Sequence, residues 1–464
     1  MPSLSQQQST CGINMNKIQI QQSPVIAIIG RPNVGKSTLF NHLSRSKQAI
    51  VANYAGLTRD RQHAKCQFNG QDYWIIDTGG LVDEKHDLFQ TMTQEQVDLA
   101  IEEADLIFFV VDSRDGLAPE DEFITRKLRK NKQPVIVLSN KSDGLDPHQA
   151  SAEFYQLGFS DVFAISAKQG HNINQMLSFV FDHCDIEDIH ENDDPDRIQF
   201  ACIGQPNVGK STLVNRLLGE NRVMVSDVAG TTRDSIAIPF EHDGQAYTLI
   251  DTAGIRRRAK IRERIEHFSI VQSLKSMDAA DIIVFLLDAQ REITEQDCQL
   301  LSLLIKKGCP FIWAVNKWDH LSQDEKIEYK AELKRRTMFV DCAEPMYISA
   351  LYGSNVGHIY KHITKTHRNL YQELSTSSLT EILKEATERH PPPMRDSRRI
   401  RLRYAHLGGR RPFTIVIHGK QTQALAQSYI RYLSHFFRKH LKLDGIPLHI
   451  KCKSNENPYV GAKK

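Results

Sequence analysis

The stretch Gly30-Arg-Pro-Asn-Val-Gly-Lys-Ser37 recurs 174 residues later as Gly204-Gln-Pro-Asn-Val-Gly-Lys-Ser211. The same offset relates two further motifs, Gly56-Leu-Thr-Arg-Asp60 to Gly230-Thr-Thr-Arg-Asp234 and Asp77-Thr-Gly-Gly80 to Asp251-Thr-Ala-Gly254. A repeat at a constant offset indicates a duplicated domain. We therefore predict two domains of one architecture in tandem.

Each repeated stretch has the Gly-x-x-x-x-Gly-Lys-Ser pattern of a P-loop. Its glycines let backbone N-H groups approach phosphates at the start of a helix, where negative charge is stabilised. We expect Lys36 and Lys210 to bind the β- and γ-phosphates of a nucleotide. The predicted phosphate-binding residues are Gly30, Asn33, Gly35, Lys36, Ser37 and Thr38 in the first copy, and Gly204, Asn207, Gly209, Lys210, Ser211 and Thr212 in the second.

The hydroxyl and carboxylate residues of the repeat predict a Mg²⁺ site in each copy. The expected Mg²⁺ residues are Ser37, Thr58, Asp77, Ser211, Thr232 and Asp251. Thr58 and Thr232 lie in loop-like segments and would join the site only while the γ-phosphate is present, which makes them candidate switch residues together with Gly80 and Gly254. The alternative is that each threonine only caps a turn.

Guanine is the base that the later motifs predict. Asn140-Lys-Ser-Asp143 and Asn316-Lys-Trp-Asp319 each provide a carboxylate that can accept the N1-H and 2-amino groups of guanine, which adenine cannot match. A backbone N-H after each next apolar segment would meet guanine O6. The predicted guanine-binding residues are Asn140, Lys141, Asp143, Ser166, Ala167, Asn316, Lys317, Asp319, Ser349 and Ala350.

Short apolar segments alternate with helical ones in both copies. Those of the first copy are 25–29, 73–76, 105–111 and 134–139, and those of the second are 199–203, 246–250, 281–287 and 310–315. This alternation predicts an α/β fold with a mostly parallel sheet covered by helices on both faces. The tail predicts a small α+β domain in the order helix, strand, strand, helix, strand, over 379–389, 400–406, 413–418, 424–440 and 447–451.

Composition sets the domain boundaries. We predict a disordered Gln- and Ser-rich leader over residues 1–23, GTPase domains over 24–184 and 197–370, an acidic linker over 185–196 and a C-terminal domain over 371–464. The linker need be no more than a solvated acidic loop. Apolar residues make up 40% of the 464 and no apolar run is long enough to cross a membrane, so we expect a cytoplasmic protein without a membrane anchor. We also expect a monomer. The eight cysteines include no C-x-x-C pair and predict neither a zinc site nor disulfides.

Charge distinguishes the tail from the rest of the chain. Residues 371–464 contain 18 Lys and Arg against 7 Asp and Glu, whereas the other residues contain 41 against 49. A basic domain attracts polyanions, so nucleic acid is the leading candidate partner.

The doubled motif set resembles the Der family, also called EngA, of double Era-like GTPases. The tail segments Arg401-Leu-Arg-Tyr-Ala-His406, Ile415-Val-Ile-His-Gly419, Tyr429-Ile-Arg-Tyr432 and Asn455-Glu-Asn-Pro-Tyr459 are similar to the C-terminal KH-like domain of that family. The resemblance implies a GTP-hydrolysing switch that assists maturation of the large (50S) ribosomal subunit. It also implies that the ribosome or its large-subunit precursor, with its rRNA and proteins, is the partner, and that GTP controls the arrangement of the domains.

Hydrolysis is predicted to be slow without assistance. The position after each Asp-x-x-Gly holds Leu81 or Ile255, and neither side chain can orient water as Gln does in many GTPases. Asn33 and Asn207 resemble the asparagines of potassium-activated GTPases, so K⁺ is a candidate activator. The alternative is that both asparagines only shape the loop.

Two groups of arginines are candidate RNA contacts. Arg256, Arg257 and Arg258 follow the second Asp-x-x-Gly, although that segment need be no more than a solvated surface. In the tail the candidates are Arg398, Arg399, Arg401, Arg403, Arg410 and Arg411. The tail lacks the Gly-x-x-Gly loop of KH domains, so we expect phosphate and shape contacts instead of sequence-specific reading of single strands.

Two other functions stay open at this point. The chain could be an RNA-binding scaffold in which one copy senses nucleotide with little turnover. A tRNA-modification GTPase is a third possibility, but such proteins carry one GTPase domain and a terminal catalytic Cys motif. This chain ends in Asn-Pro-Tyr-Val-Gly-Ala-Lys-Lys.

Overall fold

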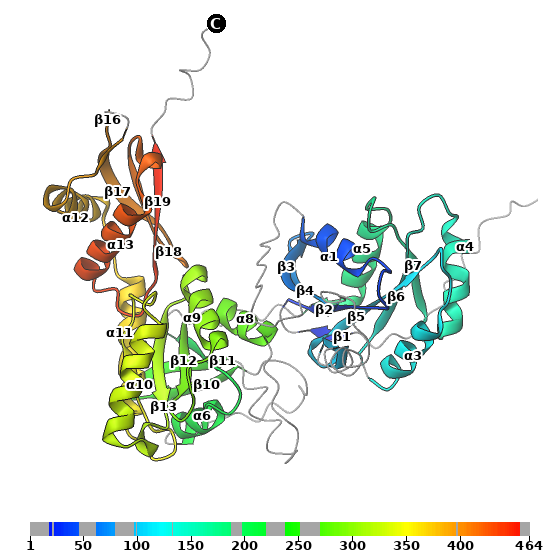
Figure 1. Cartoon of the computed structure of the whole chain (residues 1–464), viewed down its shortest axis with the longest axis horizontal. Coiled ribbons are helices and arrows are strands. Elements are labelled where there is room, and N and C mark those ends of the chain that lie inside the picture. Colours follow the sequence, from blue (N-terminus) through cyan, green and yellow to red (C-terminus); the bar gives the residue numbers. More distant parts are fainter. Residues whose placement is uncertain are drawn as a thin grey trace, which may run out of the picture. The chain divides into compact units, whose positions relative to one another are not determined.

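The computed structural model describes residues 18–20, 23–45, 62–78, 97–98, 100–131, 133–186, 197–219, 237–250, 270–395 and 398–454. The chain forms two compact units, Met1–Asp193 and Asp194–Lys464. The first unit contains the first copy of the repeat, and the second contains the second copy and the basic tail (Figure 1).

The first unit contains a six-stranded sheet in the order β3-β4-β2-β5-β6-β7, in which only β3 runs antiparallel to its neighbour. Its strands are β2 (Val25–Ile29), β3 (Gln62–Phe68), β4 (Gln71–Asp77), β5 (Leu106–Asp112), β6 (Val135–Asn140) and β7 (Asp161–Ala164). Its helices are α1 (Lys36–Ser44), α3 (Pro119–Leu128), α4 (Pro147–Ala152), the 3-10 helix η1 (Glu153–Leu157) and α5 (Ile173–His183).

The second copy repeats this topology strand for strand, in the order β10-β11-β9-β12-β13-β14. Its strands are β9 (Ile198–Ile203), β10 (Ile238–His242), β11 (Gln245–Ile250), β12 (Ile282–Asp288), β13 (Phe311–Asn316) and β14 (Pro345–Tyr347). Its helices are α6 (Lys210–Gly219), α8 (Ile270–Ala279), α9 (Glu295–Lys307), η3 (Trp318–His320), α10 (Gln323–Arg336) and α11 (Gly357–Tyr371). The predicted duplication and mostly parallel sheets are confirmed.

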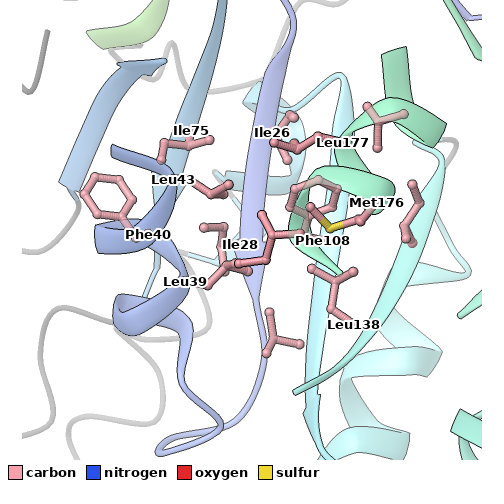
Figure 2. Packing of buried hydrophobic residues seen from close by; sticks show 14 of the residues in the cluster. Ile26, Ile28, Leu39, Phe40, Leu43, Ile75, Phe108, Leu138, Met176 and Leu177 are labelled. Atoms are coloured by element: carbon pink, nitrogen blue, oxygen red, sulfur yellow. The ribbon is translucent and has the colours of Figure 1, made fainter. Parts of the chain in front are cut away.

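Strand β2 shows why these strands are continuously apolar. All five of its residues are buried because helices cover both faces of the sheet. Ile26 and Ile28 pack with Leu39 of α1 and Met176 of α5, as Figure 2 shows. Ala27 and the next alternate residue pack on the opposite face, with residues from α3 and η1. The sheet is therefore the central layer of three, and its carboxyl edge presents the loops that follow each strand.

The tail forms a three-stranded sheet in the order β17-β18-β19, antiparallel and then parallel. Its elements are α12 (Thr376–Arg389), β15 (Met394–Arg395), β16 (Arg398–Arg399), β17 (Arg401–Arg410), β18 (Phe413–Lys420), η4 (Thr422–Ala424), α13 (Gln427–Leu441) and β19 (Leu448–Ser454). Apart from the short β15–β16 hairpin and η4, this is the predicted order of helices and strands.

The tail docks on the second GTPase domain through side chains and backbone. The Arg411 guanidinium donates to Oδ1 of Asp281 at 3.2 Å and to the Ala280 carbonyl oxygen at 2.5 Å. Arg438 donates two hydrogen bonds to the Asp341 carboxylate, at 2.6 and 2.5 Å. These bonds join the tail to α8 and to the segment after α10, so the second GTPase domain and the tail form one packed body.

One boundary differs from the prediction. Strand β1 (Ile18–Ile20) lies within the predicted disordered leader and pairs in parallel with β8 (Cys184–Ile186), the last two residues of which lie in the predicted linker. The prediction of disorder is therefore wrong for these three leader residues. The local Gln-rich composition does not reveal a pairing with a segment so distant in sequence. Residues 187–196 of the linker lie outside the described residues.

Within the described ranges, no helix combines the length and apolar character needed to cross a bilayer. Among the described residues, the cysteines at positions 66, 202, 298, 309, 342 and 452 form no disulfide bond. No cluster of three or more His, Cys, Asp or Glu side chains that could bind a metal occurs in the part of the chain that the structure describes.

Candidate nucleotide sites

The first P-loop leaves β2 at Gly30 and enters α1 at Lys36, as its sequence pattern requires. A Cβ on Gly30 would lie 2.3 Å from the Val110 carbonyl oxygen, so no larger residue fits there. Gly35 has a φ of +98° and a Cβ on it would lie 2.3 Å from Nδ2 of Asn140. Gly204 and Gly209 repeat both constraints in the second copy. Each loop is therefore held tightly against the end of a neighbouring strand.

One asparagine in each copy ties the P-loop to the predicted base-binding loops. The Nδ2 group of Asn140 donates to the Val34 carbonyl oxygen at 2.8 Å, and its Oδ1 accepts from the Ala167 amide at 2.9 Å. Asn316 makes the same two bonds, to Val208 and from Ala350, at the same distances. The sequence grouped these residues by motif, and the structure joins them in space. The two alanine amides predicted to meet guanine O6 therefore already donate to asparagine in this arrangement.

The P-loop lysines lie along the rims of their loops. Lys36 is 8% exposed and its ammonium donates to the Arg31 carbonyl oxygen at 2.8 Å. Burial lowers the pKa of Lys36, and the nearby Asp77 carboxylate partly opposes that shift. Lys210 donates to the carbonyl oxygens of Gly204 and Gln205, at 2.9 and 2.7 Å. A buried ammonium at the edge of a ring of backbone N-H groups suits a phosphate anion.

The predicted Mg²⁺ residues meet in the first copy. The Ser37 hydroxyl donates to Oδ2 of Asp77 at 2.8 Å, and the Asp77 side chain is fully buried. A hydroxyl beside a carboxylate provides the hard oxygen ligands that Mg²⁺ prefers, so the residues present fit this ion. In the second copy Ser211 is the second residue of the corresponding helix α6, whereas Asp251 lies outside the described residues.

The base-binding lysines adopt the same conformation in the two copies. Lys141 and Lys317 have φ angles of 65° and 61°, and their ammonium groups lie 2.5 Å from the carboxylates of Asp112 and Asp288. Burial of Asp112 opposes its ionisation, but the hydrogen bond and charge of Lys141, together with hydrogen bonds from the backbone of Arg114 and Asp115, outweigh this and lower the pKa of that carboxyl. Each lysine ammonium is thereby held against the carboxylate that ends strand β5 or β12.

The two predicted base-selecting carboxylates have different surroundings. In the first copy Asp143 accepts a hydrogen bond from the Ser166 hydroxyl, and its other oxygen lies 3.4 Å from the Arg114 guanidinium. In the second copy Asp319 lies 3.2 Å from Nε2 of His320. The sequence motifs alone do not distinguish these two carboxylates.

An aromatic cluster beside the second base site was missed by the sequence reasoning. Trp318 packs against Tyr347 with ring centroids 4.1 Å apart and planes inclined by 34°, and it meets Tyr329 of α10 edge to face. The Lys330 ammonium lies 4.9 Å from the Tyr347 ring and 5.6 Å from the Trp318 ring. The corresponding residue of the first copy, Ser142, only donates to the Ile165 carbonyl oxygen at 2.8 Å. The sequence did contain a sign of this cluster, because the variable position of the second Asn-Lys-x-Asp motif holds a tryptophan.

A buried carboxylate behind each P-loop was also missed. Nε of Arg31 lies 3.4 Å from the fully buried Asp121, whereas in the second copy Gln205 donates to Thr294, which in turn bonds to the buried Asp297. Burial raises the pKa of both aspartates. The second residue of the P-loop pattern therefore decides whether a guanidinium faces the buried acid.

Several predicted residues cannot be placed. Those outside the described residues are Thr58, Gly80, Leu81, Thr232, Asp251, Gly254, Ile255, Arg256, Arg257 and Arg258. Asn33 and Asn207 are described and have φ angles of 66° and 64°. Asparagine is one of the few residues that tolerates this conformation, which supports the loop-forming role.

The tail arginines divide into two groups. Arg401 and Arg403 are exposed on β17. Arg410 donates to the Leu370 carbonyl oxygen at 2.6 Å, and Arg411 binds α8 as described above. The structure therefore gives the last two candidates a partner within the chain, which the local sequence does not indicate. Arg398–Arg399 form β16.

Family comparisons match nearly the whole chain. The model of the 50S ribosome-binding GTPase family matches residues 25–141 and 199–317, and that of the KH-domain-like C-terminal region of EngA bacterial GTPase enzymes matches residues 373–453. GTPase Der of Coxiella burnetii is 48% identical over 442 residues, which cover 95% of this chain and 99% of that protein. The chain belongs to the Der family. Like other Der proteins it is a GTPase with tandem P-loop domains and a KH-like domain.

A second Der protein aligns with this chain over a similar length. GTPase Der of Pseudomonas aeruginosa is 47% identical over 462 residues, covering 95% of this chain and 94% of that protein. Among solved structures, Era of Aquifex aeolicus aligns at 22% identity with a TM-score of 0.28, covering 56% of this chain and 93% of that one. The Der relatives, which align over almost their full length, are the comparisons on which the family assignment rests.

Proposed function

We propose that this protein is a cytoplasmic, GTP-controlled assembly factor that binds the large ribosomal subunit or its precursor. The observation that carries the proposal is the joint match of both GTPase domains to a 50S ribosome-binding GTPase family and of the basic tail to the KH-like domain of EngA enzymes. GTP loading sets the arrangement of the domains for binding the particle, and hydrolysis releases it.

The geometry supplies the groups for this cycle. Backbone N-H groups of each P-loop and the lysines Lys36 and Lys210 bind the phosphates and offset charge that develops during phosphoryl transfer. Ser37 and Asp77 would hold Mg²⁺, which neutralises phosphate charge when bound. Thr58 and Thr232 act as switches that report the γ-phosphate.

Turnover depends on assistance because neither copy has a Gln after its Asp-x-x-Gly motif. Asn33 and Asn207 are the residues that would hold K⁺, the proposed assistant, which would supply charge where an arginine otherwise does. GTP hydrolysis is therefore expected to be faster in KCl than in NaCl at matched ionic strength, and Asn33→Gly with Asn207→Gly should remove the difference while keeping the loop conformation. Equal rates of the unchanged protein in the two salts would contradict the K⁺ role.

Separate P-loop variants test the main proposal. Lys36→Ala and Lys210→Ala each remove one phosphate-binding ammonium, for which a loss of roughly 100-fold in the affected domain's turnover is expected. Sedimentation with purified large subunits, in a GTP analogue and in GDP, is expected to show nucleotide-dependent binding that at least one variant abolishes.

The same experiment separates the proposal from the scaffold alternative. Binding to the subunits that is identical in both nucleotides and in both variants would indicate an RNA-binding scaffold and would overturn the switch. Absence of binding in every nucleotide state would overturn the ribosomal partner. Lys130→Ala is the matched control, since this exposed lysine lies outside the nucleotide sites.

A further inference from the structure

The sheet of the KH-like domain has one covered face and one that its own helices leave open. Ala405, Ile415 and Ile417 are buried in a core with residues of α12 and α13, which both pack on this side (Figure 1). The Ala405 amide donates to the Thr380 hydroxyl of α12 at 3.2 Å. Because side chains alternate along a strand, Tyr404, the residue preceding Ala405, lies on the opposite face.

The strand register places aromatic rings and cations in rungs on this opposite face. One rung joins Tyr404, His418 and Lys453 through their backbone pairings. The next rung joins His406, Val416 and Lys451, and a third, beyond a bulge, pairs Arg401 with Lys420. Directly paired residues share a face of the sheet. We call this set the open-face platform.

The rings at the centre of the platform are stacked. Tyr404 and His418 have centroids 4.5 Å apart and planes inclined by 6°, and His406 lies 5.2 Å from His418. Tyr404 is 37% exposed. The stack keeps the Tyr404 ring in a fixed orientation, and its exposed surface can receive another flat group.

The charge around these rings has a single sign. No Asp or Glu occurs between residues 397 and 443, and none occurs in β19. The four cations Arg401, Lys420, Lys451 and Lys453 of the platform are all exposed. At the other end of the sheet, His449 contacts the Ile305 carbonyl oxygen at 3.1 Å, so the second GTPase domain meets the sheet there and leaves the cationic end uncovered.

We infer that the open-face platform binds unpaired RNA, with a base stacked on Tyr404 and backbone phosphates held by the lysines and Arg401. Stacked rings within a cationic surface are the combination that binds single strands without regard to sequence, because every base has a flat face. This agrees with the absence of a Gly-x-x-Gly clamp. The inference rests on the proposed ribosomal function and specifies what the tail recognises: exposed, unpaired nucleotides of an RNA.

Fluorescence anisotropy with the full-length protein tests the platform. The probes are labelled twelve-nucleotide RNAs, oligo(U) and oligo(A), and the same strands annealed to each other. Tyr404→Ala is expected to weaken single-strand binding about tenfold, the effect of losing one stacked base, whereas Tyr404→Phe keeps the ring and stays within about twofold of the unchanged protein. Lys451→Glu with Lys453→Glu should weaken binding of single and paired strands and reduce its salt dependence.

The control is Tyr155→Ala, which removes an exposed tyrosine of η1 in the first GTPase domain and is expected to leave RNA binding unchanged. Thermal unfolding checks that each variant folds, and the lysine variants test the platform even where Tyr404→Ala loses stability. The stacking inference would be overturned if Tyr404→Ala left the affinity for single-stranded RNA unchanged. It would also be overturned if Tyr404→Ala lowered the affinity for paired RNA as much as that for single strands. A face covered by protein, such as the first GTPase domain, would produce the first of these results.

Sedimentation with large subunits separates this inference from the proposed function. If the protein sediments with the subunits in a nucleotide-dependent manner but Tyr404→Ala does not change its affinity for single strands, the proposed function stands and the platform inference is wrong. If the protein does not sediment with the subunits in any nucleotide state, the proposal of a ribosomal partner is wrong, whatever the affinity of the protein for free RNA.

Discussion

The two GTPase domains share one set of binding contacts but have different surroundings. Both keep a glycine at φ near +98° against the asparagine that ends the fifth strand of the domain, Asn140 or Asn316. The residues around these shared contacts differ: Gln205 stands in the second domain where the first has Arg31, and Trp318 where the first has Ser142. Only the second domain shares its compact unit with the KH-like domain. The two copies thus share the contacts between the P-loop and this asparagine, while the surrounding residues differ.

The largest effect is expected from a substitution that blocks one nucleotide site and leaves the other unchanged. Gly35→Val places a branched side chain at φ +98° and within 2.3 Å of Asn140, and Gly209→Val does the same against Asn316 at 2.2 Å. We expect a cost of at least about 3 kcal/mol, or more than a hundredfold in guanine-nucleotide affinity, at the changed site. Titration calorimetry should find one bound GDP per chain in each variant. Two bound GDP molecules would contradict the requirement for glycine.

A second variant tests the contact between the second GTPase domain and the KH-like domain, which the first GTPase domain lacks in its own unit. Arg438 is 7% exposed and binds Asp341 with two hydrogen bonds, so Arg438→Ala leaves the aspartate without its partner. Since Asp341 is largely exposed, we expect a loss of only about 2 kcal/mol in the unfolding of the second unit. Denaturant unfolding followed domain by domain should show that the first GTPase domain is unchanged, with Arg431→Ala on the same helix as control. A similar loss in the first domain would contradict the division into two units.

A third variant tests the aromatic support of the second base site. Trp318→Ser removes the ring contact with Tyr347 and the contact with Lys330, and we expect about 2 kcal/mol of lost stability in this domain and weaker GDP binding. The matched change Ser142→Ala in the first domain removes one hydrogen bond and should cost about 1 kcal/mol. GDP affinity is measured in proteins in which the P-loop of the other domain is blocked, by Gly209→Val for the Ser142 variant and by Gly35→Val for the Trp318 variant. Equal effects of the two changes would show that the aromatic cluster adds no support.

The smallest effect concerns the buried acid behind the P-loop. Arg31→Gln removes the guanidinium beside Asp121, so we expect about 1 to 2 kcal/mol of lost stability at neutral pH. Burial raises the pKa of Asp121, and the guanidinium favours its ionised form, so the contribution of the pair is full above this pKa and is lost as the pH falls through it. Unfolding of wild type and variant should therefore differ less at acidic pH.

The reciprocal change provides the control for that comparison. Gln205→Arg would bring a guanidinium toward Asp297, but Gln205 already donates to Thr294, so any gain should be smaller than the loss in the first domain. A difference between wild type and Arg31→Gln that grows as the pH falls would contradict the assigned pair.

Much of the fold could be predicted because its signals are local. The P-loop glycines, the Asn-Lys-x-Asp motifs and the apolar segments each state a backbone or packing requirement within a few residues, and their doubling revealed two domains. The pairing of β1 with β8 could not be predicted, since strand pairing joins Ile18–Ile20 to residues more than 160 positions away. Local composition there indicated only a polar leader.

By itself, the sequence determined the chemistry of the nucleotide sites and the order of the elements, because phosphate and guanine recognition depends on residue types at short spacings. Only the tertiary structure decided how the arginines are used. Arg411 and Arg401 look alike in the sequence, yet Arg411 binds the end of α8 while Arg401 is exposed at the edge of the platform. Charge is a property of the residue, but its partner is set by the fold that brings distant segments together.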